Sequence, residues 1–433
     1  LAIIEQTKKA KEQYNHEIIN ILLERHTKEE LQDYLDSGYV EYYEPNYEVE
    51  LFDAEYSDEL YGGQWYHSKI KSSYAWDLST YGNDVKIAVI DSGCNEHPDI
   101  VDNLQSGYDF VNLTETTTDT LGHGTHVSGI IAAGMNDEGI IGISNKAKII
   151  PLKCFDTGKT AKVLTIYDAI ISAVDDYDCD IINMSWGIDS DSETLRKGIN
   201  YANDNGVLLV AAVGNKGNDV LYYPAAYDCV VGVGAVDKNL EMCEFSQYNS
   251  SVHVVAPGQN ILSLGVSNDN YATMDGTSQS APMVTSLVAM MLNLDGNITI
   301  DEVKTILANC SYDLGDTGYD SNYGYGLINI QKVFEYMLQS EEYYMSPISM
   351  EDNSAEILVY NNTSDSLECD LIVGLYNDKS FGQCSIIPVT LNGQQSLKYI
   401  LGNPNDYKTV KCFLWSDINS LVPLTECRKY VVN

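Results

Sequence analysis

The sequence predicts an α/β fold in which a parallel sheet is flanked by helices, with a small α+β segment before it and a small β-sandwich after it. Between about residues 57 and 338, short apolar runs rich in β-branched residues alternate with amphipathic stretches. Strands that alternate with helices indicate a parallel sheet covered on both faces. The pattern changes at both ends, so we predict three parts, at residues 1–52, 53–340 and 345–433.

The central part contains the strongest strand and helix signals. The runs predicted as strands are residues 85–90, 149–154, 181–184, 207–213, 229–236 and 252–255. The helical patterns between and after them are residues 163–174, 193–203 and 280–292. Because open parallel sheets bind ligands beyond the carboxyl ends of their strands, we expect the functional residues in the loops at that edge.

The two ends of the chain follow other patterns. Residues 1–52 are rich in Lys and Glu and show helical periodicity at 18–23 and 31–35, and residues 39–45 resemble a strand that stops at a proline. This combination predicts a short α+β unit. In residues 345–433, short apolar strands such as 357–360, 371–376 and 410–415 are separated by Asn, Asp and Gly, which predicts the β-sandwich.

Composition excludes several classes of function. The net charge is −38, from 63 acidic and 25 basic residues, which disfavours binding to nucleic acid or to an anionic membrane surface. No apolar run approaches the roughly 18 to 20 residues that span a bilayer. The ten cysteines form no C-x-x-C pair, so zinc-ribbon and thioredoxin-like sites have no support. Four cysteines fall near the C-terminus, where bridges could form in a pairing that the sequence leaves open.

Three motifs carry the chemistry: VIDSG at residues 89–93, GHGTHVSG at 122–129 and GTSQSAP at 276–282. A serine hydroxyl is a weak nucleophile that needs a base within reach, and the base needs an anion to orient it. Asp91 ends an apolar strand, whereas His123 and Ser278 each open an apolar helix after a glycine. We predict that Asp91, His123 and Ser278 act together in this way.

Each motif also has a simpler interpretation. Asp91 can be a turn residue, and Ser278 can be the N-cap of its helix. His123 and His126 lie three residues apart and could bind a metal, but no Cys or Glu in helical register completes such a site. We expect His126 to pack in the core. The three motifs in the order Asp, His, Ser favour catalysis over these separate explanations.

With these motifs, residues 57–338 resemble the subtilisin-like serine proteases, or subtilases. Further landmarks are VAAVGN at 210–215, NMSWG at 183–187, VAPG at 255–258 and YGYGLIN at 323–329. The resemblance implies a serine endopeptidase with Asp91, His123 and Ser278 as its catalytic triad and no organic cofactor. It also implies that Asn215 and the backbone N–H of Ser278 stabilise the oxyanion.

The resemblance also suggests where the substrate lies. Ser185, Trp186 and Gly187 belong to the segment that pairs with the substrate, and Trp186 is expected to line an apolar subsite. Lys216 falls on the rim of the primary pocket, which Tyr222 would narrow. A cation on that rim would favour a substrate Glu or Asp by about 1 kcal/mol, although an exposed Lys without influence is the simpler alternative.

Two accessory features follow from the same resemblance. Residues 39–51 resemble the tail of a subtilase propeptide, so residues 1–52 are expected to inhibit the enzyme until autocleavage between Glu48 and Asp53. Residues 134–140 (GMNDEGI) resemble the calcium loop of the family. Structural Ca²⁺ is then expected, with Gln64, Asp99 and Asn136 as ligands, because oxygen-rich loops suit hard cations. An ordinary polar turn is the alternative.

Two other functions are compatible with the sequence. The chain could be a dedicated processing protease for one precursor peptide, or a catalytically silent binding protein locked by its propeptide. We expect a secreted or extracellular monomer whose partners are a peptide or protein substrate and its own propeptide. The first residue is Leu rather than Met, so we expect an upstream stretch, which could hold a signal peptide.

Overall fold

The protein is described by a computed structural model, in which the chain divides into two compact units, Leu1–Glu55 and Tyr56–Asn433. The structure describes residues 2–6, 21–24, 40–45, 56–78, 80–267, 270–339, 343–345, 349–351, 354–361, 363–377, 380–393, 395–400, 409–416 and 428–431.

The first unit contains a three-stranded antiparallel sheet in the order β2-β1-β3. The strands are β1 (Ala2–Gln6), β2 (Ile21–Glu24) and β3 (Val40–Pro45). The strand predicted to stop at Pro45 is confirmed. The helical prediction was wrong at residues 21–23. Three consecutive apolar residues fit the period of a helix as well as that of a strand, and here they pair with β1. The other residues with helical periodicity lie outside the described residues.

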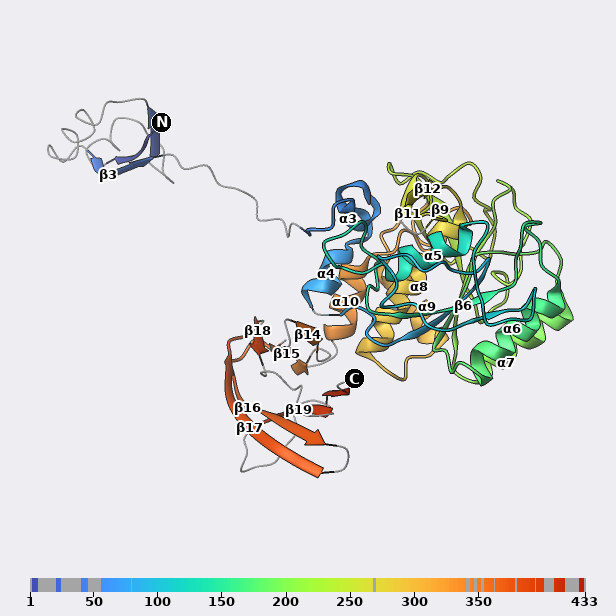
Figure 1. Ribbon diagram of the computed structural model, residues 1–433. Helices are drawn as coiled ribbons and strands as arrows, with labels where there is room; N and C mark the ends of the chain where they lie inside the picture. The colour runs from blue at the N-terminus through green and yellow to red at the C-terminus, as the bar shows by residue number, and fades with distance from the viewer. Residues whose placement is uncertain are drawn as a thin grey trace. The chain divides into compact units, whose positions relative to one another are not determined.

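The second unit is built on a seven-stranded sheet in the order β10-β9-β8-β7-β4-β6-β5, in which every neighbouring pair is parallel. The predicted parallel sheet is therefore confirmed (Figure 1). Its strands are β4 (Lys86–Asp91), β5 (Tyr108–Asp109), β6 (Lys148–Lys153), β7 (Ile181–Met184), β8 (Leu208–Ala212), β9 (Val231–Val236) and β10 (Val254–Pro257).

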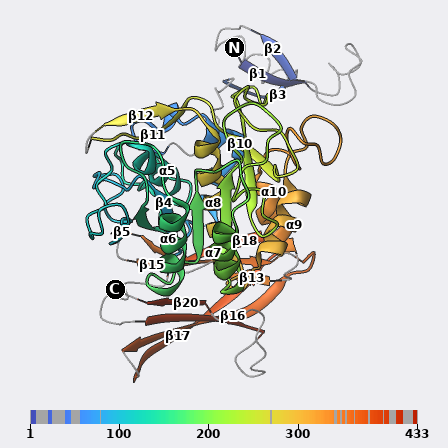
Figure 2. The same cartoon turned by 90° about the vertical axis from the view of Figure 1, so that its right-hand side faces the viewer.

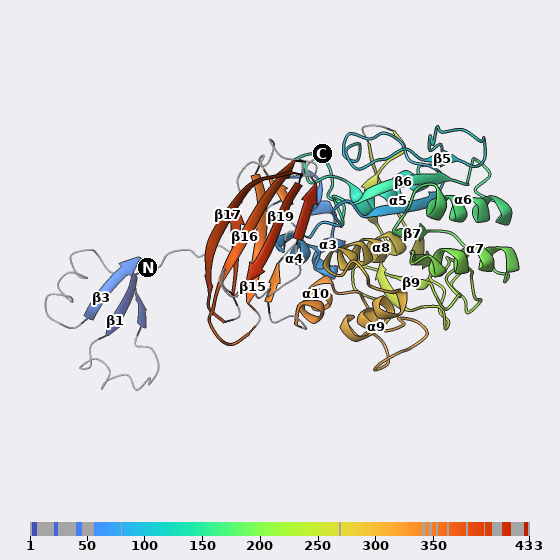
Figure 3. The ribbon, with the colours of Figure 1, turned by 90° about the horizontal axis from the view of Figure 1, so that it is seen from below.

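Helices cover both faces of this sheet. On one face, α5 (His123–Ala132) packs against α8 (Thr277–Leu294), and α8 also contacts β7 to β10. On the other face, α6 (Val163–Asp175) packs against α7 (Glu193–Asp204). Figure 3 shows α6 and α7 side by side, away from α8. The strands are accordingly buried along their length, which explains their continuous β-branched runs.

The strand order changes direction beside β4. From β7 to β10 the strands follow chain order, whereas β6 and β5 lie on the other side of β4. The loops that leave the carboxyl ends of β4 and β7 therefore diverge, which opens a crevice at that edge. Asp91 is the last residue of β4 and Ser185 follows directly after β7, so both belong to this crevice.

Smaller elements complete the second unit. They are a 3-10 turn (Tyr61–Gly63), α3 (Tyr66–Ile70), α4 (Ser72–Asp77), the hairpin of β11 (Ile261–Leu264) and β12 (Tyr271–Met274), α9 (Ile300–Cys310) and α10 (Ile330–Gln339). A capping box starts α9, in which the Thr299 hydroxyl accepts from the Glu302 N–H and the Glu302 carboxylate accepts from the Thr299 N–H.

The strands beyond α10 form two antiparallel sheets, seen below the seven-stranded sheet in Figure 2. One sheet pairs β15 with β13, β14 and β18, and the other has the order β17-β16-β19-β20. Apolar side chains of both sheets share one buried cluster, so the predicted β-sandwich is present. The strands are β13 (Tyr343–Met345), β14 (Ser349–Glu351), β15 (Ser354–Asn361), β16 (Leu367–Asn377), β17 (Ser380–Leu391), β18 (Gln395–Ile400), β19 (Thr409–Trp415) and β20 (Arg428–Val431). Among the described cysteines of these sheets, Cys369 and Cys384 are free thiols.

Candidate active site

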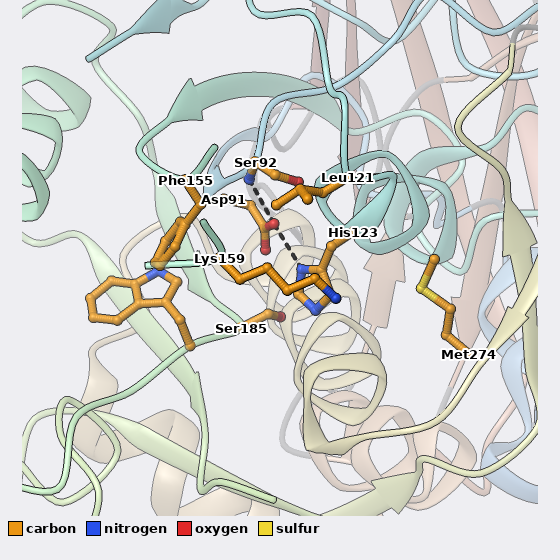
Figure 4. A pocket seen from close by; sticks show the side chains of 9 residues that line it. Asp91, Ser92, Leu121, His123, Phe155, Lys159, Ser185 and Met274 are labelled. Carbon is orange, nitrogen blue, oxygen red and sulfur yellow. Dashed lines mark hydrogen bonds and ion pairs between the residues drawn. The ribbon is translucent and has the colours of Figure 1, made fainter. Parts of the chain in front are cut away.

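Asp91 and His123 meet at the carboxyl end of β4. The imidazole Nδ1 of His123 lies 2.8 Å from Asp91 Oδ1, and the same oxygen accepts from the Ser92 N–H at 2.7 Å (Figure 4). Asp91 is buried, whereas the His123 side chain is about one-third exposed. Because Nδ1 is engaged by the carboxylate, Nε2 is the nitrogen left to exchange a proton with another group.

A second buried carboxylate holds the turn that carries His123. Asp119 Oδ1 accepts from the backbone N–H groups of Leu121 and Gly122, and Asp119 Oδ2 accepts from the N–H and hydroxyl of Thr125. These bonds satisfy donors at the start of α5 that have no partner within the helix. Asp119 was not predicted, because it lies three residues before the N-cap Gly122 and no local pattern shows that its carboxylate turns back onto the helix start.

The charges around His123 act against each other. Burial lowers the pKa of His123, but the negative charge of Asp91 and its hydrogen bond, with the charge of Asp119, raise this pKa above its ordinary value of 6.5. The positive charge of Lys159 opposes the rise. The ring is therefore a stronger base than a free imidazole, and its basicity depends on a few identified neighbours.

Ser278 is tied to the end of β7 in both directions. Its hydroxyl donates to the carbonyl of Ser185 at 2.9 Å, and the Ser185 hydroxyl donates to the carbonyl of Ser278 at 2.9 Å. The second bond has a local cause: Pro282, four residues on in α8, has no N–H to offer to that carbonyl. The structure thus brings Ser278 to Ser185, and Asp91 to His123.

Asn215 presents its amide nitrogen beside Ser278. Its Oδ1 accepts from the N–H and the hydroxyl of Thr277, at 2.8 and 2.9 Å. This fixes the orientation of the carboxamide, so Nδ2 faces the other way as a donor. Gln247, buried and not predicted, holds the same loop by accepting from the Lys216 N–H and donating to Asn218.

A cavity of about 290 Å³ opens in front of His123. Asp91, Ser185 and Trp186 line it, together with Phe155 and Lys159. The indole of Trp186 donates to the carbonyl of Ile90, which fixes the ring against the end of β4. In Figure 4 the side chain of Lys159 extends across this cavity towards His123. Lys159, also not predicted, brings a positive charge to its wall.

Tyr222 fills the space between two glycines near the site. A Cβ atom on Gly187 would lie 3.3 Å from Cδ1 of Tyr222, and one on Gly214 would lie 3.3 Å from its Cγ. The ring therefore stands between the segment after β7 and the loop that carries Asn215. Lys216, next to that loop, is exposed.

His126 packs in the core, as predicted. Its side chain is fully buried, and Nε2 lies 3.0 and 3.1 Å from the carbonyls of Ile261 and Ala272. Burial, together with the nearby charge of His123, lowers the pKa of His126 to about 4. His126 is therefore neutral near pH 7 and structural.

The candidate calcium ligands differ in whether their side-chain oxygens are already hydrogen-bonded to the protein. The Gln64 amide is already bonded to the protein, because Oε1 accepts from the Ile141 N–H and Nε2 donates to the Ile141 carbonyl and the Tyr66 hydroxyl. Asp99 instead has a buried oxygen, Oδ1, without a partner among the described residues, as does Asp58 through Oδ2. Burial raises the pKa of Asp99 to about 7.

The loop of residues 134–140 lies against these two carboxylates. Asp58 accepts from the Asn136 N–H at 3.1 Å, and Asp99 accepts from the Ile140 N–H at 2.9 Å. Within the described ranges, no group of three or more His, Cys, Asp and Glu side chains could hold a metal. The orphaned carboxylate oxygens fit a cation that takes its remaining ligands from backbone oxygens. Asp58 was missed because no motif marks it.

The sheet, and the serine-bearing helix and Asp–His pair at its carboxyl edge, define a subtilisin-like serine protease. The sequence profile of the subtilase family matches residues 82–326. The chain belongs to the subtilase family.

Individual relatives agree with this assignment. The chain is 39% identical over 266 residues to the minor extracellular protease Epr of Bacillus subtilis (strain 168), and that alignment covers 61% of this chain but only 41% of Epr. It is 37% identical over 302 residues to a thermophilic serine proteinase of Bacillus sp. (strain AK1), covering 69% of this chain and 73% of the relative. It is 34% identical over 267 residues to subtilisin Savinase of Lederbergia lenta, covering 62% and 97%.

A solved structure has the same fold. Among proteases from Pseudoalteromonas arctica PAMC 21717, one chain superposes with a TM-score of 0.60 at 27% identity, covering 65% of this chain and 99% of its own. Separately, in the part of the chain that the structure describes, no helix is both long and apolar enough to cross a membrane.

We predict that Lys159→Gln raises the pKa of His123, because the variant removes a positive charge that disfavours the imidazolium. The measurement is an NMR pH titration of histidine-labelled protein in a Ser278→Ala background, which prevents self-digestion. The matched control is Lys162→Gln, an exposed lysine three residues along the chain. An unchanged or lowered His123 pKa in Lys159→Gln, relative to this control, contradicts the electrostatic assignment.

Proposed function

We propose that this protein is a serine endopeptidase whose catalytic triad is Asp91, His123 and Ser278. The observation that carries the proposal is the bond of 2.8 Å between His123 Nδ1 and Asp91 Oδ1, which leaves Nε2 as the base. Ser185 lines the cavity in front of His123, and its carbonyl accepts from the Ser278 hydroxyl, which supports a place for Ser278 at the same cavity. The proposed mechanism requires this hydroxyl to turn from Ser185 towards His123 Nε2. Catalytic hydrogen bonds often tighten only when substrate is bound.

The mechanism follows from these positions. Ser278 Oγ attacks the scissile carbonyl while its proton passes to His123, and Asp91 stabilises the imidazolium. The developing oxyanion accepts hydrogen bonds from Asn215 Nδ2 and from the backbone N–H of Ser278, and a donor of this kind is worth roughly 3 to 4 kcal/mol. His123 then protonates the leaving amine, and water hydrolyses the acyl-enzyme.

The enzyme is made as a zymogen in this proposal. The chain divides between Glu55 and Tyr56, close to the predicted propeptide boundary. The predicted cut between Glu48 and Asp53 lies outside the described residues. Because the relative Epr is named an extracellular protease, we place this monomeric enzyme outside the cell as well.

We predict that Ser278→Ala abolishes self-processing, because the cut requires the nucleophile of the same chain. Mass spectrometry of the purified wild type is expected to give a product that begins between residues 49 and 53, whereas Ser278→Ala keeps its N-terminal part. Only the wild type is expected to react with a fluorophosphonate. The same cut in both proteins would assign the processing to another protease.

Experiments on the same purified protein distinguish the two other functions, a silent binding protein and a dedicated processing protease. A silent binding protein would leave the wild type unlabelled by the fluorophosphonate. A dedicated processing protease would be labelled and would cleave one precursor peptide but not casein. The reactive-site geometry favours turnover over silence, and the alternatives differ further only in specificity.

In this proposal, the pocket for the substrate side chain next to the scissile bond has little depth. The substrate side chain next to the scissile bond enters between the segment 185–187 and the loop of Asn215, where the Tyr222 ring already stands against Gly187 and Gly214. Small side chains are therefore preferred at this P1 position. Lys216 on the exposed rim favours a short acid, Asp, over a neutral residue of the same size.

We predict that Tyr222→Ala increases kcat/KM for a Phe P1 peptide about tenfold or more relative to an Ala P1 peptide, because it reopens an apolar pocket. The control is Tyr336→Ala, which removes a half-exposed tyrosine on α10. An unchanged Phe-to-Ala ratio in Tyr222→Ala would show that the ring does not limit P1. A Lys216→Glu variant that still cleaves Asp P1 equally well would remove the rim lysine from the account.

We also propose a structural Ca²⁺ at the loop 134–140, held by the carboxylates of Asp58 and Asp99 with Asn136 and its neighbours in the loop. Gln64 is left out, because its amide is used by Ile141. The support is the pair of buried carboxylate oxygens that have no partner among the described residues, because burying such charges is costly without a cation. The ion would neutralise these charges and fix the loop against the segment that precedes α3.

We predict that a chelator lowers the melting temperature of the wild type and that added Ca²⁺ restores it, because an ion bound only to the folded state stabilises it. Asp99→Asn is expected to make the melting temperature insensitive to both treatments. The control Asp204→Asn, at the exposed end of α7, keeps the full response. A wild type that melts identically with and without chelator would refute the calcium site.

A further inference from the structure

Gln279, the residue after Ser278, carries a buried carboxamide with no partner. Its side chain is 1% exposed, and neither Oε1 nor Nε2 has a hydrogen-bond partner among the described residues. A buried amide in this state has lost its hydrogen bonds to water without replacing them, and natural proteins contain few such groups. A polar group that violates this rule beside a nucleophile calls for a functional explanation.

The amide lies beside Gly276 at the start of α8, close to two nitrogen atoms, and we call the space between these groups the hollow. Gly276 has φ +150°, and a Cβ atom there would lie 3.0 Å from Gln279 Oε1, 3.1 Å from Asn215 Nδ2 and 3.6 Å from the backbone nitrogen of Ser278. Asn215 Nδ2 and the Ser278 N–H are the donors already assigned to the oxyanion. Gln279 thus lines the same hollow as both of them.

The orientation of this amide is not fixed by the protein. Asn215 is held by Thr277, so its nitrogen must face the hollow, but no neighbour distinguishes Oε1 from Nε2 in Gln279. A half-turn of the carboxamide presents Nε2 where Oε1 now lies. An anion in the hollow favours that half-turn, because it attracts a donor and repels the carbonyl oxygen.

We propose that Gln279 is a third oxyanion donor, a catalytic residue whose Nε2 binds the tetrahedral intermediate together with Asn215 and the Ser278 N–H. This inference rests on the proposed function. The amide finds its partner only when negative charge develops on the substrate oxygen, so the interaction lowers the barrier without tightening the ground state. In the free protein, the Gln279 amide carries the free-energy cost of a missing hydrogen bond. The transition state supplies that bond and removes the cost.

The test compares Gln279→Met with the wild type. Met has a similar volume but cannot donate, so kcat is expected to fall about tenfold or more while KM changes little. A peptide aldehyde ending in alaninal is the probe: Ser278 Oγ adds to its carbonyl carbon while the hydroxyl proton passes to His123, the π bond of the C=O opens, and the resulting oxyanion lies in the hollow. Its affinity is expected to fall in parallel with kcat, while that of the matched alaninol, which forms no adduct, is unchanged.

Stability provides a second readout, in the opposite direction. Gln279→Met removes a buried amide without a partner, so its melting temperature is expected to equal or exceed that of the wild type. Gln279→Glu keeps the shape but places a carboxylate beside the oxyanion, so its alaninal affinity is expected to fall further. Gln331→Met is the matched control, since that amide lies on α10 and is bonded to Glu335.

Failure of the proposed function and failure of the third oxyanion donor give different experimental results. A wild type that does not react with a fluorophosphonate overturns the proposed function itself. A reactive wild type with unchanged kcat and alaninal affinity in Gln279→Met overturns only the third donor. An equal loss of alaninal and alaninol affinity, or a clearly lower melting temperature, assigns Gln279 to packing and overturns the proposal as well. Full alaninal affinity in Gln279→Glu has the same consequence.

Discussion

The active site depends on a hydrogen bond that α8 cannot make within itself. Pro282 leaves the Ser278 carbonyl without its helical donor, and the Ser185 hydroxyl supplies one from the end of β7. The Ser278 hydroxyl returns a bond to Ser185, and Thr277 binds the loop of Asn215. Two segments far from α8 in the sequence, the end of β7 and the loop of Asn215, thus converge on its first turn, where we propose that the substrate oxygen binds.

The electrostatics of the site depend on position more than on the overall charge of the chain. Exposed charges are screened over about 10 Å at ordinary ionic strength, so most of the acidic surface has little influence on His123. Asp91 and Asp119 are buried and close, and both raise the pKa of His123, whereas Lys159 lowers it. Asp119 also fixes the turn before α5, so the same carboxylate sets both the position and the basicity of the imidazole.

The sequence predicted the parts of the site that are local and missed those created by tertiary contacts. Asp91 and His123 could be assigned because a strand end and a helix start are local features. The bond of Ser278 to Ser185 could not be predicted, since it depends on which carbonyl Pro282 leaves free and on what the fold brings to it. The bonds between the Gln64 amide and Ile141 could not be predicted either, because a motif does not reveal which side-chain oxygens are already used. Residues 21–23 carry no period that separates strand from helix.

Unpaired buried polar atoms mark the places where this sequence departs from the rules of a stable core. Among the described residues, Asp91 Oδ2 and the Gln279 amide lie at the active site, and oxygens of Asp58 and Asp99 lie beside the loop 134–140. A sequence selected for stability alone would pair or replace these groups. In the functions that we propose, each of these four residues faces a position where chemistry supplies a charge: an imidazolium, an oxyanion or a cation. The cost of burying them in the free protein is therefore the condition for binding those charges when they arrive.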